Sequence, residues 1–172
     1  ISWTSYYNGP ANGNDIAKAI ADDASGNVYV TGESDGSGTN KDAATVKYNS
    51  TGNQSWDVRY NAPANSNDAA NAIALDVSNN IIVAGYTTNS AGNKDALTVK
   101  YSNSGSQSWA AIFAGTSALD DYFNAVTVQD GANIFAVGKT TTSAQSGNYI
   151  IVKYNNSGVQ KWAAQYNGPA ND

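Results

Sequence analysis

Apolar and polar residues alternate at every second position over short segments of this chain. Val28 and Val30 mark one such segment, and Trp56, Val58 and Tyr60 mark another. A step of two places alternate side chains on opposite faces of an extended backbone, so each segment is predicted to be a β-strand. The first four predicted strands span residues 17–23, 27–33, 42–49 and 54–60.

This four-strand pattern recurs with a period of 53 residues. The alanine-rich stretch 16–21 is the one ambiguous segment, but its counterpart 122–128 is aromatic and β-branched, which favours a strand in every copy. We therefore expect repeats at 15–67, 68–120 and 121–172, preceded by a terminal outer strand and loop at 1–14. The recurring residues are Trp3, Trp56, Trp109 and Trp162; Asp15, Asp68 and Asp121; Gly32, Gly85 and Gly138; Lys47, Lys100 and Lys153; Tyr48, Tyr101 and Tyr154.

Turn residues indicate how the strands connect. Residues 25–27 and 50–53 are rich in Ser, Gly and Asn, which favour tight hairpins, whereas the other connections are longer. The run Ile81, Ile82 and Val83 is apolar on both faces, so each sheet needs cover on both sides. Sheets stacked around an axis supply it, which predicts an all-β fold of β-propeller-type blades. The segment from Trp3 to Pro10 matches the one from Trp162 to Pro169, which predicts a duplicated outer strand.

Composition excludes several classes of function. The 172 residues carry a formal net charge of −5 and nine scattered basic residues, so we expect neither a nucleic-acid partner nor an anionic membrane surface. No apolar run approaches the roughly 20 residues needed to cross a bilayer, so no membrane insertion is expected. The absence of Cys and His excludes disulfides, thiol chemistry and His-based triads.

The order of these motifs resembles that of the SBBP-type β-propeller repeats of bacteria and archaea. The resemblance is carried by Gly-Asn-Val-Tyr-Val-Thr-Gly at 26–32, Val-Lys-Tyr at 46–48 and Gly-Asn-Gln-Ser-Trp at 52–56, and it covers essentially the whole chain. The third copy departs from it, since Gln129 stands where the earlier copies have Asp23 and Asp76, and Asn148 replaces Asp42 and Asp95. The resemblance implies a large secreted or cell-surface protein, usually without an assigned reaction.

The recurring residues have structural and functional interpretations. The tryptophans on the outer strand are expected to pack against the adjacent sheet, with sugar stacking as the alternative. Each mid-strand lysine must reach solvent or a carboxylate, and Asp42 or Asp23 of the same repeat are the expected partners of Lys47. Catalytic lysine chemistry is not expected.

Carboxylates raise two further hypotheses. Asp15, Asp68 and Asp121 precede the first strand of each repeat and are candidate calcium ligands, although capping of the local turn is the favoured interpretation. Adjacent carboxylates at 22–23 and 120–121 are poorly arranged for glycoside hydrolysis, because neighbouring strand residues point to opposite faces. The segments 49–51, 53–55 and 155–157 fit the glycosylation sequon.

Three blades span too small an arc to close a ring, since propellers have typically four to eight. We expect either a piece of a longer propeller or several copies meeting end to end, with other copies or further repeats as partners. The favoured function is a non-enzymatic extracellular or cell-surface structural module that assembles by blade stacking and strand addition. The alternative is a glycan- or protein-binding module that uses loops 12–15, 34–41, 65–68 and 88–95. No cofactor is expected, apart from the calcium hypothesis.

Overall fold

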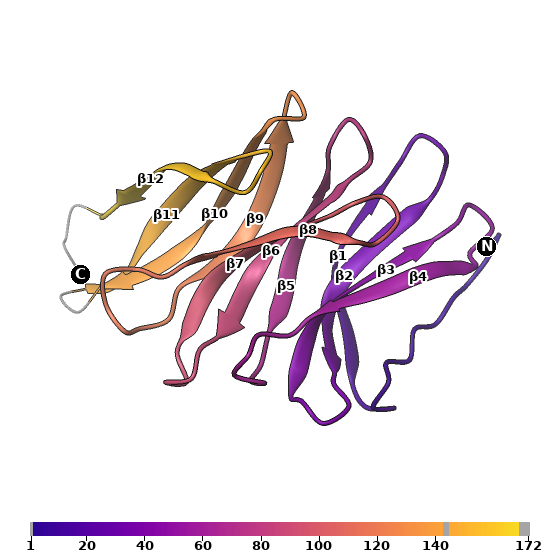
Figure 1. Ribbon diagram of the computed structural model, residues 1–172, viewed down its shortest axis with the longest axis horizontal. Helices are drawn as coiled ribbons and strands as arrows, with labels where there is room; N and C mark the ends of the chain where they lie inside the picture. The colour runs from indigo at the N-terminus through magenta and orange to yellow at the C-terminus, as the bar shows by residue number, and fades with distance from the viewer. Residues whose placement is uncertain (1, 143–144, 169–172) are drawn as a thin grey trace.

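A computed structural model describes residues 2–142 and 145–168 of the chain. The described residues form three separate four-stranded antiparallel sheets, each with its strands in chain order, and contain no helix. The sheets stand in a row, with the N-terminal segment beside the first sheet and β12 at the opposite end (Figure 1). The first sheet contains β1 Asp15–Asp22, β2 Val28–Asp35, β3 Lys41–Tyr48 and β4 Gln54–Tyr60; the second contains β5 Ala69–Leu75, β6 Ile81–Thr88, β7 Lys94–Tyr101 and β8 Gln107–Phe113; the third contains β9 Tyr122–Gln129, β10 Asn133–Thr142, β11 Gln145–Asn155 and β12 Gln160–Tyr166.

The prediction of an all-β chain with four strands in each period is confirmed. The predicted extra outer strand at Ser2–Asn8 is wrong, because residues 2–9 form no strand. The reason is the lack of a pairing edge. β4, β8 and β12 each pair with the third strand of their own sheet, whereas the described residues include no third strand to which residues 2–9 could pair in this way.

Each sheet has two apolar faces that we name by their tryptophan and tyrosine residues. The forward face carries Trp56, Trp109 or Trp162, and the rear face carries Tyr48, Tyr101 or Tyr154. The forward face of the first sheet and the rear face of the second form one core, which contains Tyr29, Ala43, Ile81, Val83, Leu97, Val99 and Tyr101. The second and third sheets form another in the same way, with Ile82, Ala84, Ala96, Phe123, Ile134, Ala136, Ile150, Val152 and Tyr154. Burial between sheets is therefore the main source of apolar stabilisation.

The recurring glycine of the second strand accommodates a bulge in the first strand. The pairing of β5 with β6 shifts between Ala70 and Ala72, and a Cβ atom on Gly85 would lie 2.0 Å from the Ala69 carbonyl oxygen. Gly32 and Gly138 make the same close approach to β1 and β9. Any side chain at these positions would push the bulged strand away, which explains the period of this glycine.

No helix in the described part of the chain is long and apolar enough to span a membrane.

Replacement Gly85→Ala should lower the free energy of unfolding by about 3 kcal/mol, because the added methyl group overlaps backbone rather than a movable side chain. Urea unfolding followed by circular dichroism measures the change. Gly168→Ala is the matched control, since no atom lies within 4 Å of a Cβ at that position. Equal stability of Gly85→Ala and the original chain would show that the bulge does not require glycine.

Candidate functional site

The interfaces between sheets contain most of the recurring residues, and the tryptophan is the central contact. Trp56 and Trp109 each extend from the outer strand of one sheet to a glycine in the last turn of the next. A Cβ on Gly158 would lie 2.6 Å from Cδ2 of Trp109, and one on Gly105 would lie 3.1 Å from Cδ2 of Trp56. Both glycines also have positive φ, 78° and 88°, which L side chains rarely adopt. The turn therefore needs glycine both for its conformation and for the indole.

The indole and the recurring lysine hold the same asparagine of the following sheet. Trp56 Nε1 donates to the Asn103 carbonyl oxygen at 3.1 Å, and Lys47 Nζ donates to the Asn103 side-chain oxygen. Trp109 Nε1 donates to the Asn156 carbonyl oxygen at 2.9 Å, and Lys100 Nζ donates to its side chain. We call this arrangement of Trp, Lys and Asn the inter-sheet clasp. It adds directional bonds to apolar packing and so fixes the register of one sheet on the next.

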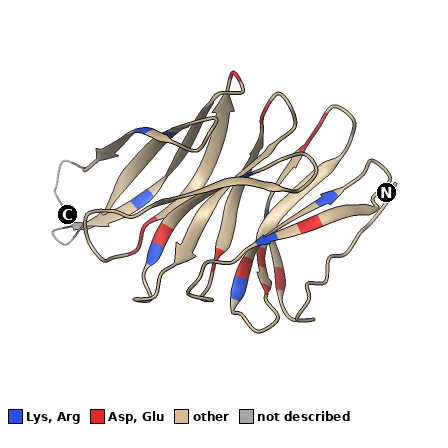
Figure 2. Ribbon diagram, in the orientation of Figure 1, with Lys and Arg blue, Asp and Glu red and all other residues tan. Residues whose placement is uncertain are grey.

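Basic and acidic residues are scattered over the sheets (Figure 2). The three recurring lysines have different partners within their own repeats. Lys100 pairs with Asp76 at 2.7 Å, and both side chains are nearly inaccessible to solvent. Lys47 lies over the ring of Tyr29. In this repeat the Tyr29 hydroxyl group, and not the lysine, donates a hydrogen bond to Asp23. Lys153 lies over Phe135 at 5.5 Å, in the repeat where Gln129 replaces the aspartate. The ion pair expected from the sequence is therefore present in the second repeat, whereas Lys47 has an asparagine partner in the next sheet.

Asp68 and Asp121 hold the loop that precedes their own strands. Asp68 Oδ2 accepts from the Ala62 amide at 2.9 Å and Asp68 Oδ1 from Thr87 at 2.6 Å, while Asp121 accepts from the amides of Gly115 and Thr141. Asp15 accepts from the Gly9 amide in the same way. Burial raises the pKa of Asp68 despite these hydrogen bonds. No three acidic side chains among residues 2–142 and 145–168 group closely enough to hold a metal ion.

The paired carboxylates and the sequon asparagines proposed from the sequence do not form a shared site. Most of them bind the backbone of their own turns. Asp23 accepts from the amides of Ser25 and Asn27 and so caps its hairpin, whereas its neighbour Asp22 is exposed. Asn49, the first residue of a sequon, accepts from the Thr51 and Asn53 amides. Asn155 does the same for its own turn.

Sequence reasoning missed the side chains at the bulges. Lys18, Asn71 and Asn124 are the extra residues in the first strand of each sheet. Lys18 donates to the Asn71 side chain at 3.2 Å, and Asn71 donates to the Phe123 carbonyl oxygen at 2.9 Å. The sequence contained a signal for these residues. They are spaced by the 53-residue period, and each is a polar residue between two apolar ones.

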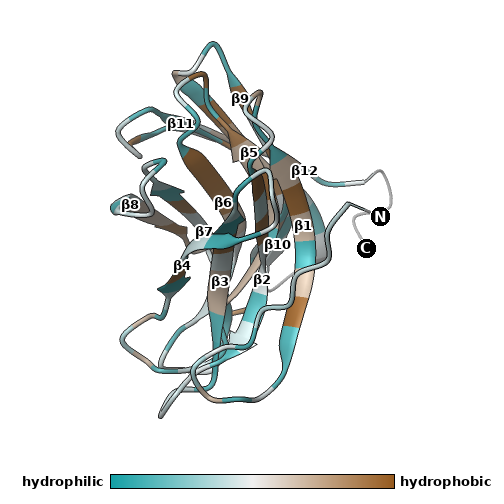
Figure 3. Ribbon diagram, turned by 90° about the vertical axis from the view of Figure 1, so that its right-hand side faces the viewer, coloured by the Kyte–Doolittle hydropathy of each residue, from teal (hydrophilic) through white to brown (hydrophobic). Residues whose placement is uncertain are grey.

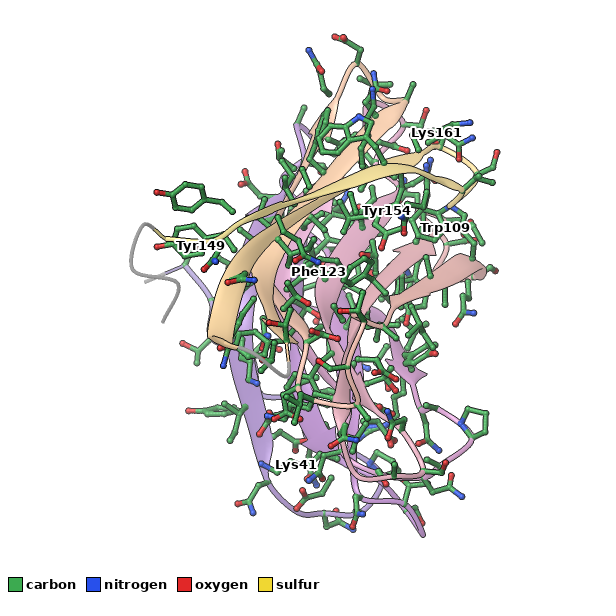
Figure 4. All side chains as sticks on the ribbon, turned by 90° about the vertical axis from the view of Figure 1, so that its left-hand side faces the viewer. Lys41, Trp109, Phe123, Tyr149, Tyr154 and Lys161 are labelled. Carbon is green, nitrogen blue, oxygen red and sulfur yellow. The ribbon has the colours of Figure 1, made fainter. Side chains whose placement is uncertain are left out.

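Among residues 2–142 and 145–168, no sheet lies in front of the forward face of the third sheet (Figure 4). Tyr149, Tyr166, Trp162 and Val137 there are 74%, 61%, 42% and 37% exposed. Ala43, Ala96, Thr31 and Ala84, which match Tyr149 and Val137 in the other sheets, are buried, and the residues that match Trp162 and Tyr166 are partly buried. Tyr149 and Tyr166 stack at 6.2 Å between ring centroids and border a shallow hollow with Val137 and Ile151. This surface, which we call the open forward face, therefore has the positions that are buried between the other sheets but is itself exposed.

The rear face of the first sheet is covered by the chain's own N-terminal segment, residues 2–9 (Figure 3). Trp3 stacks on Tyr48 at 6.3 Å, and a Cβ on Gly52 would lie 2.6 Å from its Cδ2 atom. These are the contacts that Trp109 makes with Tyr154 and Gly158. The segment thus occupies the place of the outer strand of a preceding sheet, without the rest of that sheet.

Comparisons with known proteins give a fold likeness only. No family model matches the chain, and no curated protein matches it. A solved structure described as a crystal structure of the eukaryotic initiation factor is similar, with a TM-score of 0.52 and 10% sequence identity. The match covers 88% of this chain and 32% of that one, so the chain spans about a third of the length of its structural neighbour. At this identity the likeness concerns the arrangement of strands alone.

Trp109 and Trp162 allow a direct measurement of what a neighbouring sheet contributes. Trp109→Ala should lower the free energy of unfolding by about 3 kcal/mol, because it removes an indole packed against the third sheet. Trp162→Ala should cost about 1 kcal/mol, because that indole is 42% exposed and so loses less packing. Urea unfolding followed by circular dichroism compares the two. Equal losses would contradict the importance of inter-sheet packing.

Asp76→Asn should destabilise the fold by about 3 kcal/mol at neutral pH, because it leaves Lys100 buried without its carboxylate. Burial opposes the charge of Asp76, but hydrogen bonds from Lys100 and Asn80 hold its pKa below the usual value of 3.8. The ionised carboxylate therefore stabilises the fold above pH 3.8, and this contribution is lost as the pH falls through the lower pKa of the folded state.

The difference between the Asp76→Asn variant and the original chain should accordingly shrink in acid. Denaturant unfolding at a series of pH values from 7 to 2 measures it. Asp22→Asn serves as control, since Asp22 is exposed on β1. A stability difference that stays constant down to the lowest pH would contradict the ion pair.

Proposed function

We propose that this protein is a non-enzymatic assembly module whose propeller-like sheets stack on sheets of other molecules to build oligomers or filaments. The open forward face carries the proposal. Tyr149, Tyr166, Trp162 and Val137 are all exposed there, whereas the corresponding face of each earlier sheet is buried against the next repeat. A group of exposed apolar side chains on one face is typical of an interaction site.

The unused half of the clasp supports the same function. Lys153 and Trp162 stand where Lys100 and Trp109 hold Asn156. Lys153 instead lies over the ring of Phe135, which in turn contacts Trp162 at 6.1 Å. Both donors are therefore in position for a turn of an incoming sheet, which supplies register as well as apolar contact.

The edge of the third sheet also supports assembly. All seven residues of β12 are exposed, whereas alternate residues of β8 are partly buried by the sheet in front. β12 is thus an outer strand whose unpaired edge and open face are both accessible, and such an edge is a template for strand addition. The resemblance to SBBP-type repeats favours an extracellular or cell-surface location for such an assembly.

A binding function at the loop end remains the second candidate. A polar hollow lined by Asp35, Thr39, Asn40 and Lys41 lies between loops of the N-terminal segment and of the first repeat. Hydroxyl, amide and charged groups around a concave surface suit a glycan or a polar peptide. Saturable binding to a glycan array, unaffected by changes to the third sheet, would favour this candidate over assembly.

Assembly should fail when a charge is placed in the open forward face. Val137→Lys should leave the protein monomeric at concentrations where the original chain forms larger species, because the ammonium group would be buried without a partner. Sedimentation velocity and electron microscopy measure the species present. Val77→Lys is the matched control, since Val77 is 85% exposed in the hairpin between β5 and β6. A monomeric original chain at all accessible concentrations would refute the proposal.

A further inference from the structure

We propose that the open forward face is occupied by the rear face of the first sheet of a second copy of this chain, in the same register as the two internal interfaces. This inference rests on the proposed assembly function and specifies its partner and geometry. The internal interfaces provide the template. In each of them, forward and rear faces meet with the same repeat positions in one core.

The sizes of the side chains at one pair of facing positions point to a second copy of the chain as the partner. Ala43 on the first forward face shares a core with Leu97 on the second rear face, and Ala96 shares the next core with Ile150. Each internal interface thus combines a small forward residue with a large rear residue. The third forward face has Tyr149 at this position, and the first rear face has Ala44.

At the two ends of the row the large residue, Tyr149, is on the forward face and the small residue, Ala44, is on the rear face. This is the reverse of the arrangement at both internal interfaces. Tyr149 would overlap a Leu or Ile from a further repeat like the second or third, whereas it fits against Ala44 of another copy. Complementary volumes are what close-packed interfaces require. A neighbouring position follows the trend, since Val28 on the first rear face is smaller than Ile81 and Ile134.

The clasp can also form between copies. Asn103 and Asn156, which hold the preceding Trp and Lys, correspond to Ser50 in the first repeat. Ser50 is exposed and offers a backbone carbonyl oxygen for the Trp162 indole and a hydroxyl oxygen for Lys153. The incoming sheet therefore has acceptors for both unused donors.

The N-terminal segment is a removable cover over this rear face. Trp3 occupies the Gly52 position that Trp162 of the second copy would take. Residues 2–9 are held by few directed contacts, notably Gly9 with Asp15 and Tyr7 with Asp57, and they form no strand ladder. The segment leaves a cavity of about 340 Å³ above the sheet, and Ile20 on β1 stays 69% exposed. A whole sheet would cover this face better than the segment does.

A size-swap experiment tests the register. Tyr149→Ala, Ala44→Leu and the double variant are made in the full chain, and the concentration for half association is measured by sedimentation velocity. Each single variant should raise this concentration about tenfold or more, one by leaving a void and the other by overlap. The double variant should return to within about threefold of the original, because it restores the small and large order of the internal interfaces.

Controls separate folding from association. Val77→Ala removes an apolar side chain that is 85% exposed in the hairpin between β5 and β6, outside both faces, and should not change association. Circular dichroism establishes that every variant is folded. Trp3→Ala should loosen the cover and lower the half-association concentration about tenfold. The Tyr149→Ala and Ala44→Leu variants are then also made in the Trp3→Ala chain.

The outcomes distinguish this inference from the function on which it rests. Association that is insensitive to Tyr149→Ala and Ala44→Leu, or a double variant no better than the weaker single one, overturns the register and the partner while leaving assembly intact. An original chain that stays monomeric at all accessible concentrations overturns the assembly function and this inference with it.

Discussion

The requirement that both faces of every sheet be covered governs this structure. Each repeat produces a sheet with apolar side chains on two sides, and a four-stranded sheet cannot bury them by itself. Within the chain, the second sheet is covered on both sides, and its Ile81, Ile82 and Val83 are almost inaccessible to solvent. The first and third sheets each have one neighbour. The chain covers one of the two remaining faces with residues 2–9 and leaves the other open.

The clasp turns this general apolar demand into a specific geometry. Apolar packing alone lets sheets slide, because it is nearly non-directional. The bonds from Trp109 and Lys100 to Asn156 fix one sheet on the next, and the bulge side chains such as Asn71 repeat this at the inner strands. The proposed assembly uses the same contacts, since Trp162 and Lys153 at the end of the row stand where Trp109 and Lys100 bind Asn156.

The two ends of the row are different in character. The open forward face carries large aromatic side chains, with Tyr149 where the earlier sheets have alanine. The first rear face carries a small side chain, Ala44, at the position where the later sheets have Leu97 and Ile150. In the proposed assembly, residues 2–9 would have to leave that rear face before another copy could bind there. Control of assembly through a segment that mimics the partner's outer strand would limit uncontrolled polymerisation, which is the hazard of any head-to-tail interface that does not close.

Much of the architecture was determined by the sequence itself. The 53-residue period, the step of two and the turn residues predict the twelve strands closely, because these are local properties of the backbone and of its turns. Gly85 and Gly105 were visible as periodic glycines. Only the tertiary structure shows why glycine is needed there. Gly85 makes room for the bulge in β5, and Gly105 makes room for the Trp56 indole of the preceding sheet. Tertiary structure likewise gave Lys47 an asparagine partner from the next repeat and left residues 2–9 without a strand, despite their likeness to β12. Strand pairing and side-chain partners depend on which edge and which face are present in space, and a linear pattern does not contain that information.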